Sequence, residues 1–205
     1  MSYLAMKKII ILFFTLLLIS CNSLEEVKIM DDKGNLSEEF LKDKEGKIQG
    51  IKTTFVEGVK YSEENYTDDI LNGKRKIFYA NGNVEVEEQY VNGVLEGVVK
   101  TYFENGKLLL TAEYSKGTLT GVVKRYFEDG QLKEEVNFVD NEENGPFKEY
   151  HSNGKVAWEG SYINGENEFG LIIQYDELGA ILKKMECDTF MGFSKCKTIW
   201  KAEND

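Results

Sequence analysis

Few residues of this chain have the types and spacing that catalysis or metal binding requires. His151 is the only histidine, which excludes a metal site built from several histidines and leaves little for histidine-based catalysis. The acidic residues are spread along the chain, and no serine, cysteine or lysine stands in a recognisable nucleophile motif or phosphate-binding loop. We therefore expect no catalytic residues, no metal, no cofactor and no small-molecule substrate.

The N-terminus carries the clearest chemical signal. Lys7 and Lys8 precede a mostly apolar run, 9–19, a pattern typical of an export signal and short for a permanent membrane span. The run ends in Leu18-Ile19-Ser20-Cys21, which resembles the bacterial lipobox. This resemblance implies that residues 1–20 are a lipoprotein signal peptide and that Cys21 is the site of lipid attachment. An ordinary signal peptide, or a short anchor with an incidental cysteine, is the alternative.

A lipid on Cys21 would anchor the protein to a bacterial membrane on its extracytoplasmic side, either in the periplasm or on the cell surface. Residues 21–29 are then expected to be a short tether. The formal net charge of the chain is -11, so an anionic bilayer does not attract the body and the lipid alone holds it there. The same negative charge disfavours nucleic acid as a partner.

Cys187 and Cys196 are the two other cysteines, and we expect a disulfide between them, because exported proteins can keep disulfides. A two-residue turn at Met191-Gly192 would place them opposite each other in a hairpin. Closing this loop of about ten residues contributes roughly 2–3 kcal/mol in the chain-entropy model. Residues 187–205 are thus expected to form a capping hairpin and tail. A longer turn that contains Gly192, or two free thiols in a reducing envelope, are the alternatives.

The body of the chain is a repeat of 24 residues. One glycine series marks turns, and a second series lies between them. The turn series is Gly34, Gly58, Gly82, Gly106, Gly130, Gly154 and Gly179, and the second is Gly73, Gly97, Gly121, Gly145 and Gly170. Runs of β-branched and aromatic residues lie on both sides of Asn-Gly or Asp-Gly pairs, which are typical of tight hairpins. One repeat is therefore one β-hairpin.

Consecutive hairpins make a meander. The expected fold is all-β, an elongated antiparallel meander of about seven 24-residue β-hairpin repeats in a single twisted sheet, over residues 30–186. About fourteen strands at a spacing of about 4.8 Å give a sheet roughly 65 Å long. No segment after the signal shows a long apolar pattern at helical spacing.

Aromatic residues recur at fixed positions of the repeat and predict an aromatic ladder, with one ring per hairpin stacked along the sheet. Its members are Tyr66, Phe78, Tyr90, Tyr102, Tyr114, Tyr126, Tyr150 and Tyr162. His151 aligns with Tyr79, Phe103 and Phe127, so it substitutes for a ring of the repeat and is not expected to be catalytic. A structural role for these rings is favoured over a tyrosine-lined binding groove.

Charged residues keep the same period. Lysines recur six residues before the turn glycine, and glutamates recur five residues after it. The lysines are Lys52, Lys76, Lys100, Lys124 and Lys148, and the second column is Glu63, Glu87, Thr111, Glu135 and Glu159. We favour a two-residue turn at the Asn-Gly pair, in which these positions face each other and four of the five pairs are Lys opposite Glu. A three-residue turn with a glycine bulge would shift the register by one and remove this pairing.

The repeat resembles a known family. Tyr90-Val91-Asn92-Gly93-Val94-Leu95-Glu96-Gly97, followed by Tyr102-Phe103-Glu104-Asn105-Gly106, looks like the MORN (membrane occupation and recognition nexus) repeat in its bacterial variant form. The resemblance is strongest from Gly73 to Gly170. It implies an elongated antiparallel sheet and a role in contact with proteins or membrane lipids.

The function expected from these observations is that of a noncatalytic, membrane-anchored repeat scaffold. It would mediate protein–protein or envelope-surface interaction at the bacterial cell envelope, with the membrane bound through the N-terminal lipid and with an unknown protein partner. An envelope hydrolase that uses a tyrosine-lined groove is an alternative, and so is an antitoxin-like or immunity-type partner. A spacer that binds nothing specific is a third class.

Overall fold

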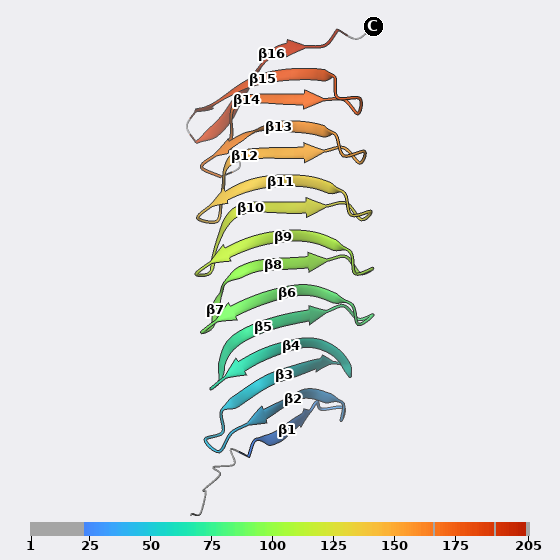
Figure 1. Ribbon diagram of the computed structural model, residues 1–205, viewed down its shortest axis with the longest axis vertical. Helices are drawn as coiled ribbons and strands as arrows, with labels where there is room; N and C mark the ends of the chain where they lie inside the picture. Colours follow the sequence, from blue (N-terminus) through green and yellow to red (C-terminus); the bar gives the residue numbers. More distant parts are fainter. Residues whose placement is uncertain (1–22, 166, 191, 204–205) are drawn as a thin grey trace, which may run out of the picture.

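The computed structural model describes residues 23–165, 167–190 and 192–203, which form one antiparallel sheet (Figure 1). Each strand pairs with its neighbour in sequence, apart from β7, which pairs with β6 beside β8. The strands are β1 (Glu25–Met30), β2 (Leu36–Lys42), β3 (Ile48–Val56), β4 (Val59–Thr67), β5 (Ile70–Phe78), β6 (Val84–Val91), β7 (Val94–Leu95), β8 (Gly97–Tyr102), β9 (Leu108–Ser115), β10 (Thr118–Tyr126), β11 (Leu132–Val139), β12 (Glu142–Tyr150), β13 (Val156–Ile163), β14 (Asn167–Tyr175), β15 (Ile181–Phe190) and β16 (Phe193–Lys201). The expected all-β meander of hairpins is confirmed.

The ends of the sheet differ in detail from the expected segments. β1 begins at Glu25, so residues 25–29 of the expected tether pair with β2 and belong to the sheet. At the other end, β15 serves both as the last strand of the repeats and as the first strand of the terminal hairpin with β16. The signal segment 1–20 and Cys21 lie outside the described residues. Within the described part of the chain, no helix is long and apolar enough to cross a membrane.

Two kinds of turn lie at the two long edges of the sheet. At one edge, both central residues have positive φ, as at Asn92 (49°) and Gly93 (80°), which is the signature of a type I′ hairpin turn. The equivalent pairs are Asp68-Asp69, Lys116-Gly117, Asp140-Asn141 and Asn164-Gly165.

The Asn-Gly turns at the opposite edge contain three residues instead of the expected two. The Gly82 N–H donates to the Tyr79 carbonyl, the Tyr79 N–H donates to the Asn83 carbonyl, and Gly82 has a φ of 86°. This is the turn with a glycine bulge that would shift the register. A second irregularity, one extra residue at Glu85, shifts it back. Lys76 therefore faces Glu87 as expected.

The same compensation occurs in the later repeats, where the expected columns face each other. The pairs are Lys100 with Thr111, Lys124 with Glu135, and Lys148 with Glu159. The first expected pair is wrong. The turn between β3 and β4 is a two-residue turn, but one extra residue at Tyr61 shifts the register after it. Lys52 therefore faces Glu64 instead of Glu63 and forms its ion pair with Glu38 at 2.8 Å.

The two faces of the sheet differ in burial. One face, which we call the closed face, carries the buried side chains along its middle. Its central row runs along the sheet as Glu64, Arg75, Glu88, Val99, Ala112, Val123, Val136, Phe147, Gly160, Ile172 and Met185. The largest apolar cluster lies at its C-terminal end, where Ile172 is fully buried against Val136, Phe147 and Cys187.

The N-terminal part of the central row is charged. The Arg75 guanidinium forms ion pairs with both neighbouring carboxylates, at 3.0 Å to Glu64 and 3.0 Å to Glu88. Tyr66 and Tyr90 donate their hydroxyls to the same two carboxylates. Burial raises the pKa of Tyr66 to about 12, and the hydrogen bond to Glu64 adds to this shift. Equivalent repeat positions in the central row thus hold charged side chains in its N-terminal part and apolar side chains in its C-terminal part.

Candidate binding surface

The face opposite the closed face, which we call the open face, carries a column of exposed apolar side chains. The column lies eight residues before each turn glycine of the later repeats, and its members are Val98, Val122, Pro146 and Leu171. Val98 is 48% exposed, Val122 44% and Leu171 50%. Members of the column lie two strands apart, at roughly 9.5 Å. Single exposed apolar residues need no explanation, but a column in register offers an extended contact surface.

Two shallow hollows lie along this column at repeat-equivalent places. The first has a volume of about 260 Å³ and is walled by Lys74 and Val98, with Gln89 between them. The second has a volume of about 280 Å³ and is walled by Pro146 and Leu171, with Ser161 between them. Two repeats thus carry the same small depression at equivalent positions along the sheet.

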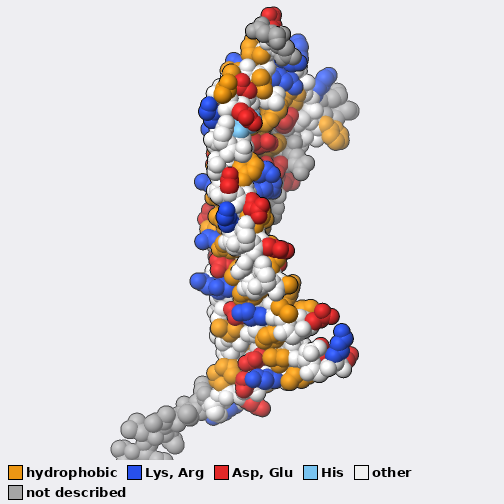
Figure 2. All heavy atoms as spheres, turned by 90° about the vertical axis from the view of Figure 1, so that its right-hand side faces the viewer, with side chains coloured by type: hydrophobic (Ala, Val, Ile, Leu, Met, Phe, Trp, Pro, Cys, Tyr) orange, Lys and Arg blue, Asp and Glu red, His pale blue; other side chains and the backbone are white. Residues whose placement is uncertain are grey.

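Beside the apolar column runs the column of paired charges. Lys76 lies 3.5 Å from Glu87, and Lys148 lies 3.8 Å from Glu159. Because these pairs are partly exposed, each contributes at most a few tenths of a kcal/mol. On the edge that carries the Asn-Gly turns, acidic and basic side chains alternate over the length of the molecule (Figure 2). This alternation gives neither sign of charge a continuous patch on that edge.

The glutamates of this column also hold the tyrosines of the open face. Tyr102 donates its hydroxyl to Glu87, Tyr150 to Glu135, and Tyr175 to Glu159. Burial and then the bond to the carboxylate raise the pKa of Tyr102 and of Tyr150 to about 12. These hydroxyls are donors with fixed carboxylate partners on the open face.

Two repeats vary this arrangement in ways that their sequences explain. At the position of Glu87, the next repeat has Thr111, which replaces the carboxylate that would accept a bond from Tyr126. At the position of Tyr102, the preceding repeat has Phe78, which has no hydroxyl to donate. Lys60 lies 4.1 Å from the centre of the Phe78 ring and bonds to Glu63 instead.

The predicted aromatic ladder is wrong as a stack of rings. Tyr66, Tyr90, Tyr114 and Tyr162 lie on the closed face, each opposite a glycine of the neighbouring strand, whereas Phe78, Tyr102, Tyr126 and Tyr150 lie on the open face. Equivalent rings are two strands apart, roughly 9.5 Å, beyond the 4.5–7 Å of aromatic pairs. Within the described residues, the ring pair that stacks is Phe147 with Tyr162, at 4.4 Å. The two columns therefore do not line one groove.

His151 has a structural contact, as its place in the repeat predicted. Its Nε2 lies 3.1 Å from the Tyr175 carbonyl oxygen, in the next repeat. Tyr79, which occupies the same repeat position, donates its hydroxyl to the Tyr102 carbonyl oxygen at 2.7 Å. Both side chains thus tie one hairpin to the next at the edge of the sheet.

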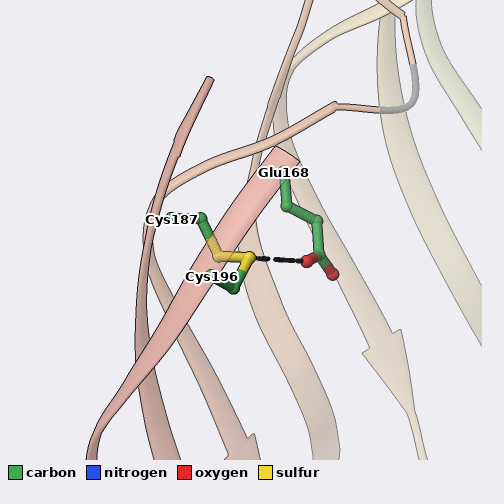
Figure 3. A group of neighbouring side chains, drawn as sticks. All are labelled: Glu168, Cys187 and Cys196. Carbon is green, nitrogen blue, oxygen red and sulfur yellow. Dashed lines mark hydrogen bonds between the residues drawn. A yellow bond between two sulfur atoms is a disulfide. The ribbon is translucent and has the colours of Figure 1, made fainter. Parts of the chain in front are cut away.

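The terminal hairpin brings three potential ligand side chains together (Figure 3). Cys187 and Cys196 face each other across β15 and β16 and are joined by a disulfide. Glu168, from β14, places a carboxylate oxygen 3.2 Å from the Cys196 sulfur and 3.9 Å from the Cys187 sulfur. Sequence reasoning missed Glu168 because it lies in the insertion before Gly170, where the 24-residue period is broken.

Comparison with known proteins supports the repeat assignment. A family model described as the MORN repeat variant matches residues 71–92, 95–116, 119–140 and 143–164. No curated protein matches the chain. A crystal structure of a porin-like protein from Bacteroides uniformis is similar over 85% of this chain and 88% of that chain, at 9% identity and a TM-score of 0.24. No catalytic family is indicated. Because the four matched segments are consecutive units of the sheet, residues 71–164 are four MORN-type repeats.

Proposed function

We propose that this repeat scaffold is anchored to a bacterial membrane by a lipid on Cys21 and binds a protein partner through its open face. The observation that carries the binding proposal is the apolar column Val98, Val122, Pro146 and Leu171, which stays exposed while the closed face buries its central row. The lipobox-like Leu18-Ile19-Ser20-Cys21 supports the anchor. The open face is the side of the sheet free to receive a partner over several repeats.

The partner fits the chemistry of this face. A surface with a regular apolar column beside balanced Lys–Glu pairs suits a protein with its own alternating apolar and polar side chains better than it suits a polyanion. Binding energy would be spread over several repeats, since each contributes one apolar side chain and two shallow hollows lie along the column. A single alanine substitution on the open face would therefore weaken binding little.

The anchor is tested by detergent phase partitioning. The protein with Cys21 is expected to enter the detergent phase, because two or more acyl chains give stable membrane attachment. Cys21→Ala is expected to move to the aqueous phase or to accumulate as the uncleaved precursor. Cys196→Ala is the matched control and should partition like the wild type. A Cys21→Ala protein that still partitions into detergent would refute the anchor.

The binding surface is tested by site-specific photocrosslinking in cells. A photoreactive side chain at Val98, Val122 or Leu171 is expected to give the same crosslinked partner, and the same probe at Glu57 or Glu104, on the turn edge, is the control. The double substitution Val98→Glu and Val122→Glu should reduce recovery of that partner at least about tenfold, which corresponds to 1.4 kcal/mol. Crosslinks from the turn edge but none from the open face would contradict the proposal, while leaving the anchor untouched.

A further inference from the structure

The group formed by Glu168, Cys187 and Cys196 has a chemistry that the repeat scaffold does not need. The Cys187 sulfur is buried at the end of the apolar cluster, whereas Cys196 lies on the exposed edge strand β16. The Ser194 hydroxyl donates to the Glu168 carbonyl, so the hairpin end bends back over β14. This bend brings the Glu168 side chain to the two sulfurs (Figure 3).

The position of the Glu168 carboxylate is not explained by the disulfide. The sulfurs of a disulfide carry no proton, so neither can donate to the carboxylate oxygen at 3.2 Å from Cys196. Among the described residues, no lysine or arginine forms an ion pair with Glu168. The Glu168 carboxylate can accept a hydrogen bond from either sulfur only when that sulfur is a thiol. When a metal ion binds, the carboxylate and the sulfurs become ligands of the same ion.

The surroundings favour a cation. Glu168 faces Tyr162 across β13 and β14 on the closed face, and Glu143 and Glu149 also act on this tyrosine. Burial raises the pKa of Glu149, the negative charge of Glu134 raises it further, Lys133 lowers it in part, and Glu168 raises it. A bound dication would offset this concentration of acidic groups.

The three ligand atoms fit a thiophilic ion. Two thiolates and one carboxylate match the ligand types and coordination number of an open zinc site, which keeps its fourth position for water. Ligand atoms around tetrahedral zinc lie roughly 3.5–3.8 Å apart, and the carboxylate oxygen already lies at 3.2 and 3.9 Å from the sulfurs. The exposure of Cys196 leaves room for the water.

We infer that reduction of the Cys187–Cys196 disulfide converts this end of the sheet into a zinc site held by the two sulfurs and Glu168. The disulfide takes two electrons and two protons from a dithiol reductant, which is itself oxidised to a disulfide. Zinc then displaces the two thiol protons, which are released to solvent. The hairpin is held closed by a covalent bond under oxidising conditions and by the metal under reducing ones.

The Cys21→Ala variant of the full chain tests this inference, because Cys187 and Cys196 are then its only cysteines. Titration of the denatured protein should find no thiol before reduction and two after it. After removal of the dithiol under argon, Zn²⁺ affinity is measured by competition with a chromophoric chelator, and Co²⁺ serves as a spectroscopic probe. The reduced chain should bind one ion with a thiolate-to-cobalt charge-transfer band. The oxidised chain should bind at least about a hundredfold more weakly, since it has no thiolate.

A matched pair of variants tests whether Glu168 supplies the carboxylate ligand of the zinc site. Glu168→Gln should weaken zinc binding by the reduced chain at least about tenfold, whereas Glu186→Gln, on the open face beside Cys187, should leave it unchanged. The oxidised form of each variant reports whether the fold is intact. Four results would each overturn the inference. They are equal zinc binding by the oxidised and reduced chains, two free thiols before reduction, no zinc binding after reduction, and equal zinc affinities of the two variants.

Discussion

Replacement of Ile172 by alanine is expected to lower the free energy of unfolding by about 2–5 kcal/mol. Ile172 is fully buried, and its side chain lies against Phe147, Val136 and the backbone of Gly160. Gly160 has no side chain that could move into the cavity, so the lost contacts are not replaced. Urea denaturation followed by circular dichroism measures the change.

The adjacent residue provides the control. Leu171 points to the open face and is 50% exposed, so Leu171→Ala should change the free energy of unfolding by no more than about 0.5 kcal/mol. Equal losses for the two variants would mean that the closed face is not the buried face of the sheet. The same outcome would remove the basis for assigning the open face to a partner.

Replacement of Arg75 by alanine is expected to cost about 2 kcal/mol, because it leaves the carboxylates of Glu64 and Glu88 facing each other in the central row without a cation. Arg125→Ala is the matched control. Its ion pair with Glu134 has the same length, 3.0 Å, but Arg125 is 49% exposed, so the expected loss is about 0–1 kcal/mol. Thermal and urea unfolding of both variants at low ionic strength measure the difference.

The charged row also predicts a gain in the free energy of unfolding, relative to Arg75→Ala, when all of its charges are removed together. The triple change Glu64→Ala, Arg75→Val and Glu88→Ala copies the residues that the next repeats place at these positions, Ala112 and Val99. Replacement of all three charged side chains leaves no carboxylate without its cation, so the triple variant should be more stable than Arg75→Ala. A triple variant less stable than Arg75→Ala would show that the charged row is needed for the register of the N-terminal repeats.

The period and the hairpins could be predicted from sequence because they depend on local constraints. A positive φ at positions such as Gly93 and Gly82 is required by the turn itself, whatever the rest of the chain does. The length of the Asn-Gly turn was predicted wrongly, since a two-residue and a three-residue turn share the same dipeptide. Lys76 still faces Glu87 because an extra residue at Glu85 cancels the shift, and nothing in the local sequence marks that residue.

The contacts between side chains were less predictable, because they depend on which face of the sheet is buried. Tyr90 and Tyr102 look alike in the sequence, yet they lie on opposite faces and donate to different glutamates, Glu88 and Glu87. The sequence pairs Cys187 with Cys196 across a two-residue turn, and the strands have that register. Glu168 reaches them only because the hairpin bends over β14, a nonlocal contact that no spacing rule contains.

The strict sequence order of the strands has a mechanical consequence. β1 and β16 lie at opposite ends of the sheet, and the strands run across its long axis (Figure 1). A force applied between the two ends would load the hydrogen bonds of one terminal strand at a time, and each hairpin that opens adds its 24 residues of extended chain, about 80 Å. Each strand pairs again only with its neighbours in sequence, so the loops that must close after the force is released are short. Refolding should therefore be fast. Held at both ends, the sheet would therefore yield hairpin by hairpin and recover, acting as an extensible link.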